Sequence, residues 1–167
     1  MSDKKGVGRV LSEVISSPHK VVTEDLAKQI LSEYGLQVPP NVIVNNAQQA
    51  AKESATIGFP LVAKVVSPMI LHKTEVKGVK TGLSSEDEAV SAFNDMYDRL
   101  RKDYEIRGIL LEKMVPSGVE LIVGLQNDPQ FGPVIMCGLG GVYTELFKDV
   151  SFRVLPIDKQ DALEMLE

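Results

Sequence analysis

The sequence has a single cysteine, no long apolar run and no excess of basic residues, and each of these absences argues against a class of protein. Cys137 cannot form an internal disulfide, which favours a reducing compartment. No apolar run approaches the roughly 18 residues of a membrane span, and the first residues lack the apolar core of a secretory signal. The chain carries 18 basic and 23 acidic residues, whereas nucleic-acid-binding proteins usually show a basic excess. We therefore expect a cytoplasmic protein that binds neither membranes nor nucleic acid.

The hydrophobic pattern predicts a mixed α and β fold. Periodic apolar residues predict helices, and short apolar segments predict strands. The predicted helices cover residues 24–34, 47–57, 86–104 and a segment from 159, and the predicted strands cover 38–44, 61–67, 78–83, 108–115, 118–126, 133–139 and 152–157. Residues 1–8 are typical of a loose tail. Helices and strands alternate over 9–106 and strands dominate over 107–167, so we expect a sheet covered by helices and a break between these two parts of the chain.

Lys64 lies within a predicted strand that is otherwise apolar. Burial of an ammonium group is costly unless an anion or another polar partner meets it. The position is therefore consistent with a fixed cation that faces a phosphate group. The alternative is a lysine in an edge strand, whose side chain extends to water.

Two carboxylates, Glu112 and Glu120, each stand alone in an apolar predicted strand, and a short connection over 116–118 joins the two strands. Carboxylates at such positions can accept hydrogen bonds from ribose hydroxyls or from the amino group of a base. The alternative is that both side chains face solvent, because half-exposed strands alternate polar and apolar residues.

The segment that follows the Lys64 strand is rich in cations. His72 stands beside Lys73, and Lys77 and Lys80 follow closely. Cationic neighbours favour the neutral imidazole, which is the nucleophilic form, and they would hold a phosphoryl group during transfer. A surface histidine without a chemical role is the alternative, and no spacing supports a zinc site.

Three long segments, residues 24–39, 59–83 and 109–158, resemble the β subunit of ADP-forming acyl-CoA synthetases, of which acetate–CoA ligase is typical. The resemblance implies an ATP-grasp fold, in which two α+β subdomains clamp a nucleotide. It implies a ligase that reversibly converts an acyl-CoA, ADP and phosphate into the acid, ATP and CoA through a phosphohistidine. It also implies ATP or ADP with Mg²⁺ as cofactors and a CoA-binding α subunit as partner.

The resemblance assigns roles to four nucleotide-binding residues. By position, Lys64 resembles the lysine that holds the nucleotide phosphates. Glu112 and Met114 resemble the segment that contacts adenine, and Glu120 resembles the carboxylate on the ribose side.

The resemblance also assigns roles within the loop over 67–80. His72 resembles the histidine that is transiently phosphorylated, and Lys73, Lys77 and Gly78 resemble the residues that receive phosphate. Lys77 stands where the family often has glycine, so we expect a restricted backbone there.

The family's metal ligands are expected beyond Glu167, so the resemblance implies a truncated chain, a piece of a larger or split enzyme, or a degenerate homologue, with an incomplete second subdomain. Such a chain should be active only with the α subunit and the further segment, and it should associate with that partner or with itself. Within the chain, Glu145 and Asp149 are the acidic candidates for Mg²⁺. A non-catalytic nucleotide sensor or assembly module is the alternative function.

Overall fold

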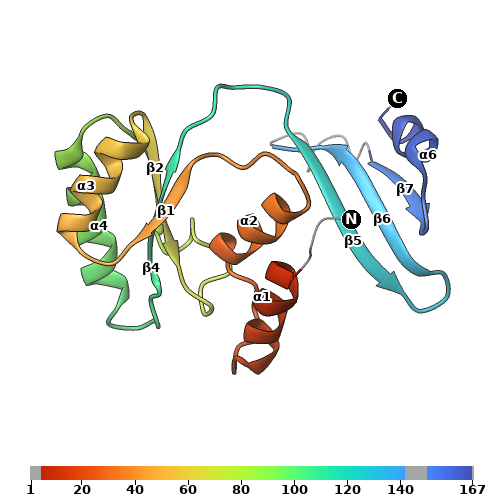
Figure 1. Cartoon of the computed structure of the whole chain (residues 1–167), viewed down its shortest axis with the longest axis horizontal. Coiled ribbons are helices and arrows are strands. Elements are labelled where there is room, and N and C mark those ends of the chain that lie inside the picture. The colour runs from red at the N-terminus through yellow and green to blue at the C-terminus, as the bar shows by residue number, and fades with distance from the viewer. Residues whose placement is uncertain (1–4, 142–149, 167) are drawn as a thin grey trace. The chain divides into compact units, whose positions relative to one another are not determined.

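The computed structural model describes residues 5–141 and 150–166, and the chain divides into two compact units, one up to Val115 and one from Pro116. The first unit contains α1 (Lys5–Ser16), α2 (Glu24–Glu33), β1 (Asn41–Val44), α3 (Ala47–Ile57), β2 (Leu61–Val66), β3 (Val79–Leu83), α4 (Glu86–Leu100) and β4 (Gly108–Lys113). The second unit contains β5 (Leu121–Asp128), β6 (Gly132–Leu139), β7 (Val150–Val154) and α6 (Lys159–Glu164) (Figure 1). The predicted mixed α and β fold is confirmed.

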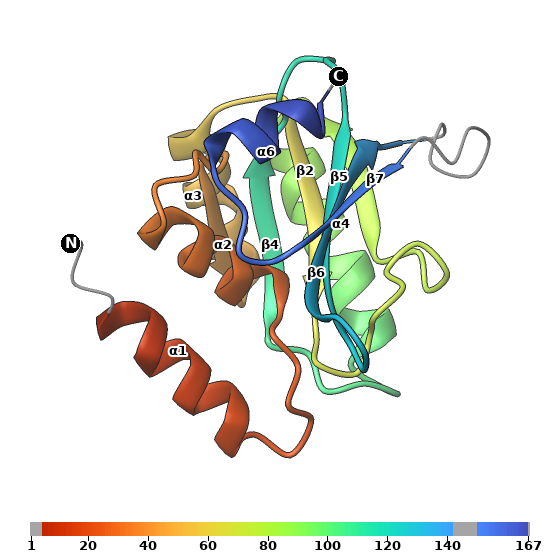
Figure 2. The ribbon, with the colours of Figure 1, turned by 90° about the vertical axis from the view of Figure 1, so that its right-hand side faces the viewer.

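The first unit is built on a four-stranded antiparallel sheet in the order β1-β4-β2-β3. Helices α3 and α4 pack on one face of this sheet, and α2 lies on the other (Figure 1 and Figure 2). Side chains alternate between the faces of a strand, so every second residue of the central strands enters the core with α4. From the central strands this core contains Leu61, Val65, Ile109 and Leu111, and from α4 it contains Phe93 and Met96.

The alternate residues of the same strands face α2. In β2 these include Lys64, and in β4 they include Leu110 and Glu112; Lys64 stands opposite Leu110 in the register. The first turn of α2 brings Glu24 to this face, where it contacts Lys64. The sheet thus has an apolar face against α3 and α4, and a face against α2 that contains charged side chains.

The second unit contains a three-stranded antiparallel sheet in the order β5-β6-β7. Asp128 closes the turn between β5 and β6, because its Oδ1 accepts hydrogen bonds from the backbone N–H groups of Gln130 and Phe131. Asp158 caps α6 in a capping box with Asp161.

The structure differs from expectation at the N-terminus. Residues 5–8, which the sequence places in a tail, belong to α1. The glycines at positions 6 and 8 weaken the helical signal in the sequence. The helix forms because Val10 and Val14 bury their side chains with Leu26 of α2, which supplies the tertiary packing that short helices need.

The structure also moves the boundary between the two parts of the chain. We expected it before residue 107, but β4 pairs with both β1 and β2 in the middle of the first sheet. The division therefore follows Val115. Strand order depends on long-range pairing, which a local hydrophobic pattern does not contain. In the described part of the chain, no helix is both long enough and apolar enough to cross a membrane.

Candidate functional site

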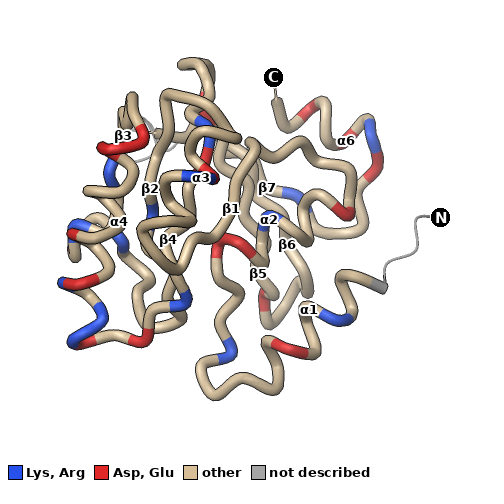
Figure 3. The backbone as a smooth tube through the Cα atoms, turned by 60° about the vertical axis from the view of Figure 1, so that its left-hand side comes forward, with Lys and Arg blue, Asp and Glu red and all other residues tan. Residues whose placement is uncertain are grey.

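Charged side chains from three elements and one loop gather on the α2-facing side of the first sheet. The positions of charged residues along the backbone are marked in Figure 3. The members of this group, here called the lysine–glutamate cluster, are Glu24, Lys28, Lys64, Lys73 and Glu112. Three ammonium groups and two carboxylates give the cluster a formal excess of one positive charge.

Lys64 is at the centre of the cluster. Its Nζ donates hydrogen bonds to Glu24 Oε1 at 2.7 Å and to Glu112 Oε1 at 3.0 Å. Burial on its own lowers the pKa of Lys64, but the two carboxylates outweigh burial and raise the pKa above its ordinary value. Because β2 lies between β4 and β3, the alternative of an edge-strand lysine is wrong. The expected anionic partners exist, and they are side chains of the protein itself.

Glu24 joins Lys64 to the loop after β2. Its Oε1 accepts from Lys64, and its Oε2 lies 3.1 Å from Lys73 Nζ. Burial on its own raises the pKa of Glu24, but the hydrogen bonds from the two lysines prevail and lower the pKa to about 2. The Glu24 carboxylate is therefore ionised at any physiological pH. Sequence analysis did not identify Glu24 or Lys28 as site residues, although their i,i+4 spacing places them on one face of a helix.

Glu112 is fixed by its position in the central strand β4, and its side chain is only 9% exposed. Its Oε2 lies 2.6 Å from Lys28 Nζ. The two groups form an ion pair, but the angles between them are not those of a hydrogen bond. Both carboxylate oxygens therefore face ammonium groups. The alternative of a solvent-facing Glu112 is wrong.

His72 is exposed on the loop between β2 and β3. Its neighbour Lys73 is tied to Glu24, so the chain immediately after His72 is docked on α2. The loop is closed by the backbone N–H of Gly78, which donates to the carbonyl of Lys73 at 2.7 Å. Because Lys73 belongs to the lysine–glutamate cluster, His72 is one residue away from the cluster along the chain.

The C-terminal part of the loop is held by α4. Arg99 donates from Nη1 to the carbonyl of Val76 at 2.7 Å and from Nη2 to the carbonyl of Lys77 at 2.9 Å. Lys77 has a φ of +49°, in the left-handed region that glycine adopts without strain. Gly78 has no room for a side chain, because an added Cβ would lie 2.5 Å from Val65 Cγ1. Lys77 therefore adopts a glycine-like backbone despite its Cβ, so the expected restriction does not keep this residue out of the left-handed region.

Met114 and Glu120 lie in different units. Met114 is half-buried after β4, where its Sδ accepts from the N–H of Gly82 at 3.2 Å. Glu120 is exposed and precedes β5, and its carbonyl accepts from the N–H of Gly140 at 2.8 Å. Strand β4 ends at Lys113 and β5 begins at Leu121, so the connection is longer than the expected 116–118 and Glu120 lies in it and not in a strand.

The two acidic candidates for a metal, Glu145 and Asp149, lie outside the described residues. Over residues 5–141 and 150–166, no three His, Cys, Asp or Glu side chains gather as a metal site would require. The carboxylates of the lysine–glutamate cluster are already paired with lysines.

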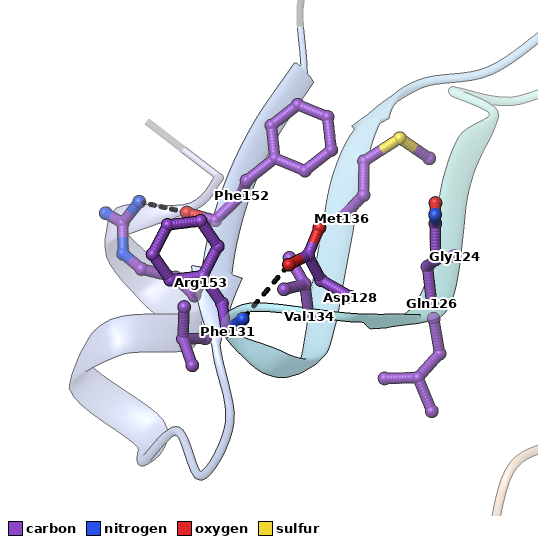
Figure 4. A pocket seen from close by; sticks show the side chains of 10 residues that line it. Gly124, Gln126, Asp128, Phe131, Val134, Met136, Phe152 and Arg153 are labelled. Atoms are coloured by element: carbon purple, nitrogen blue, oxygen red, sulfur yellow. Dashed lines mark hydrogen bonds between the residues drawn. The ribbon is translucent and has the colours of Figure 1, made fainter.

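A hollow of about 490 Å³ lies on the sheet of the second unit (Figure 4). Its apolar lining includes Phe131, Val134, Met136, Phe152 and Val154. Its two charged residues are engaged locally: Asp128 accepts from the N–H of Phe131, and Arg153 donates to the carbonyl of Phe152. The hollow therefore offers an apolar surface and lacks the free cations that a phosphate group requires.

Comparison with known proteins gives a consistent result. A family model described as "ATP-grasp domain" matches residues 13–167. The β subunit of acetate–CoA ligase [ADP-forming] I from Pyrococcus furiosus is 42% identical, over 98% of this chain and 72% of its own.

Two solved structures of the dinucleotide-forming acetyl-coenzyme A synthetase 1 of Ca. Korarchaeum cryptofilum are similar as well. One, in complex with coenzyme A, Ca-AMPCP and HgCl+, has a TM-score of 0.80 and 46% identity over 86% of this chain. This chain spans 64% of the length of that protein. The other contains coenzyme A and Mg-AMPPCP, with its phosphohistidine segment pointing towards the nucleotide binding site. It has a TM-score of 0.76 and 41% identity over 95% of this chain and 68% of its own.

Proposed function

Because the chain belongs to the ATP-grasp family, among the β subunits of ADP-forming acyl-CoA synthetases, we propose that it binds an adenine nucleotide and relays a phosphoryl group through His72. In this function it is the nucleotide-binding part of an acid–CoA ligase. A CoA-binding α subunit is the proposed partner, consistent with the description of the relative as a β subunit.

The observation that carries the proposal is that Glu24 joins Lys64 to Lys73, the residue that follows His72. Lys64 and Lys73 both contact Glu24, one from a central strand and one from the residue that follows His72. An ammonium group in a partly buried site attracts phosphate strongly, because the low local dielectric strengthens charge interactions. Nucleotide phosphates held by these two lysines would lie next to the histidine.

The chemistry proposed for His72 is a phosphoryl exchange. A ring nitrogen of the neutral imidazole attacks the γ-phosphorus of ATP, a P–N bond forms, and the P–O bond to ADP breaks. The ring proton on the other nitrogen is free to leave to solvent, because His72 is exposed. In the reverse direction ADP attacks the phosphohistidine and ATP is formed. The lysines hold the phosphoryl oxygens throughout, which stabilises their negative charge.

Mg²⁺ ordinarily neutralises charge on nucleotide phosphates in such reactions. The described residues do not offer a fitting set of ligands.

The proposal is tested by turnover of the protein with a CoA-binding α subunit, ADP, Mg²⁺, phosphate and acetyl-CoA. ATP formation is measured for the unmodified protein, for His72→Ala and for His19→Ala. The chain has only these two histidines, so His19→Ala is a matched control. We expect ATP formation that is lost in His72→Ala and retained in His19→Ala. Equal turnover in both variants would end the relay proposal.

The alternative, a non-catalytic nucleotide sensor, has less support because the similar proteins are described as ligases and synthetases. A sensor would bind adenine nucleotides with an affinity that His72→Ala leaves unchanged, and it would form no ATP under any condition of this assay.

A further inference from the structure

Glu24 connects two lysines that belong to different parts of the proposed site. Its Oε1 lies 2.7 Å from Nζ of Lys64 on β2, and its Oε2 lies 3.1 Å from Nζ of Lys73 in the His72 loop. One carboxylate therefore neutralises the strand cation and holds the loop at the same time. Any anion that competes for either lysine also competes with Glu24.

The two lysines differ in how much they depend on Glu24. Lys64 keeps a second carboxylate, Glu112, which is fixed in β4. For the Lys73 ammonium, Glu24 is the one carboxylate partner found within the described residues. If Glu24 were displaced, Lys64 would stay oriented by Glu112, while the chain at Lys73 would lose its contact with α2.

The opposite end of the loop does not depend on Glu24. Arg99 of α4 binds the carbonyls of Val76 and Lys77. These contacts lie on a different element from the lysine–glutamate cluster, and a phosphate at Lys64 has no reason to break them. Besides the backbone hydrogen bond from Gly78 to Lys73, the loop thus has side-chain contacts to α4 that are independent of the cluster, and one side-chain contact to α2 that passes through Glu24.

From this geometry we propose that Glu24 is a positioning residue that couples the filling of the phosphate site to the release of the His72 loop. Phosphate groups that take Lys64 and Lys73 displace the Glu24 carboxylate, so the part of the loop that carries His72 is released from α2 and is held by the phosphate through Lys73. The inference rests on the proposed role of Lys64 and Lys73 as phosphate-binding residues. After it has lost the two lysines, the Glu24 carboxylate is still stabilised. It lies in the first turn of α2, and its Oε1 is 3.4 Å from Lys28 Nζ.

This coupling predicts that replacing Glu24 strengthens polyphosphate binding, whereas a substitution that damages the site would weaken it. When Glu24 is replaced by Gln, polyphosphate no longer competes with a carboxylate for the two lysines. Its affinity should rise by roughly 2- to 5-fold, the range expected for one partly exposed ion pair. A variant that merely disturbed the fold would bind less tightly.

The test uses calorimetry with tripolyphosphate as the probe, on the unmodified protein, Glu24→Gln and Glu33→Gln. Glu33 is the matched control, because it is an exposed glutamate on the same helix. We expect tighter binding in Glu24→Gln only. Equal or weaker binding in Glu24→Gln, or no binding to any of the three proteins, would overturn the proposal.

A second measurement follows the loop without any ligand. The chain has two histidines, so the ring proton signals of His72 and His19 are readily assigned by NMR with His72→Ala. The His72 signal should shift in Glu24→Gln and in the milder variant Glu24→Asp, and should stay in place in Glu33→Gln. An unmoved His72 signal in both Glu24 variants would also overturn the proposal. Neither measurement depends on turnover, so a failure of the proposed relay is recognised separately by the absence of ATP formation.

Discussion

Lys64 on β2 and Glu112 on β4 are diagonal neighbours on one face of the first sheet, and their Nζ and Oε1 atoms lie 3.0 Å apart. Diagonal pairs on neighbouring strands are within reach of long side chains. Because both residues belong to central strands of the sheet, the backbone fixes the direction of the ammonium group before any ligand arrives. A phosphate-binding lysine held in this way loses little side-chain entropy when it binds.

Replacing Lys64 with Met should weaken nucleotide binding. The change keeps the bulk of the side chain and removes its charge, and lost hydrogen bonds to a charged group are worth roughly 1.5–3 kcal/mol, or about 10- to 150-fold in affinity. Calorimetry with ADP measures the effect. Lys52→Met is the control, because the Lys52 side chain is 79% exposed on α3. Equal ADP affinity in the two variants would remove Lys64 from the site.

The stability that Glu24 provides should depend on pH. Its pKa is lowered from 4.5 to about 2 by Lys64 and Lys73 against the opposing effect of burial. A group with a lowered folded-state pKa stabilises the fold fully above its unfolded pKa and loses this contribution as the pH falls towards the folded pKa. Urea unfolding of the unmodified protein and Glu24→Gln should therefore differ most above pH 5, and the difference should shrink between pH 4.5 and 2. A difference that is constant over this range would mean that the charge of Glu24 does not stabilise the fold.

Two substitutions at adjacent loop positions should change the free energy of unfolding in opposite directions: Lys77→Gly, which removes a Cβ, and Gly78→Ala, which adds one. Lys77→Gly removes a side chain from a residue with a φ of +49°. It should raise the free energy of unfolding by about 0.5–1 kcal/mol, after the entropy cost of glycine is subtracted.

Gly78→Ala, in contrast, forces a Cβ to within 2.5 Å of Val65 and 3.1 Å of the Lys73 carbonyl. It should lower the free energy of unfolding by about 1–3 kcal/mol. Thermal and urea unfolding measure both effects. The same sign of change at both positions would contradict the described loop conformation.

Removing the Arg99 side chain beyond its stem, as in Arg99→Met, should loosen the C-terminal end of the His72 loop. The variant loses two hydrogen bonds from a charged donor to the carbonyls of Val76 and Lys77. Amide hydrogen exchange across residues 76–78 should become faster. Arg101→Met is the control, because Arg101 is more exposed and pairs with Asp98 on α4 instead of contacting the loop. Unchanged exchange in Arg99→Met would show that the carbonyl contacts do not hold the loop.

Local signals in the sequence were sufficient for several elements. The helix over 47–57 was predicted with the bounds that the structure shows, because Gly58 ends it at a φ of +79° that few other residues adopt. The need of Lys64 for an anionic partner was also predictable, because the cost of a buried ammonium is independent of the fold.

Long-range pairing was not predictable in the same way. Nothing in the sequence near Lys64 identifies Glu24, which lies 40 positions earlier and meets Lys64 only after α2 packs on the sheet. The place of β4 between β1 and β2 likewise depends on strand order. This is why the predicted boundary preceded β4.

The central claim is that His72 accepts a phosphoryl group from ATP. It is tested most directly by incubating the protein and a CoA-binding α subunit with ATP labelled at the γ-phosphate and with Mg²⁺, and then measuring label on this chain. The account predicts an acid-labile and alkali-stable label that is absent from His72→Ala and present in His19→Ala. A label that persists in His72→Ala, or an unmodified protein that supports ATP formation without ever carrying label, would contradict it.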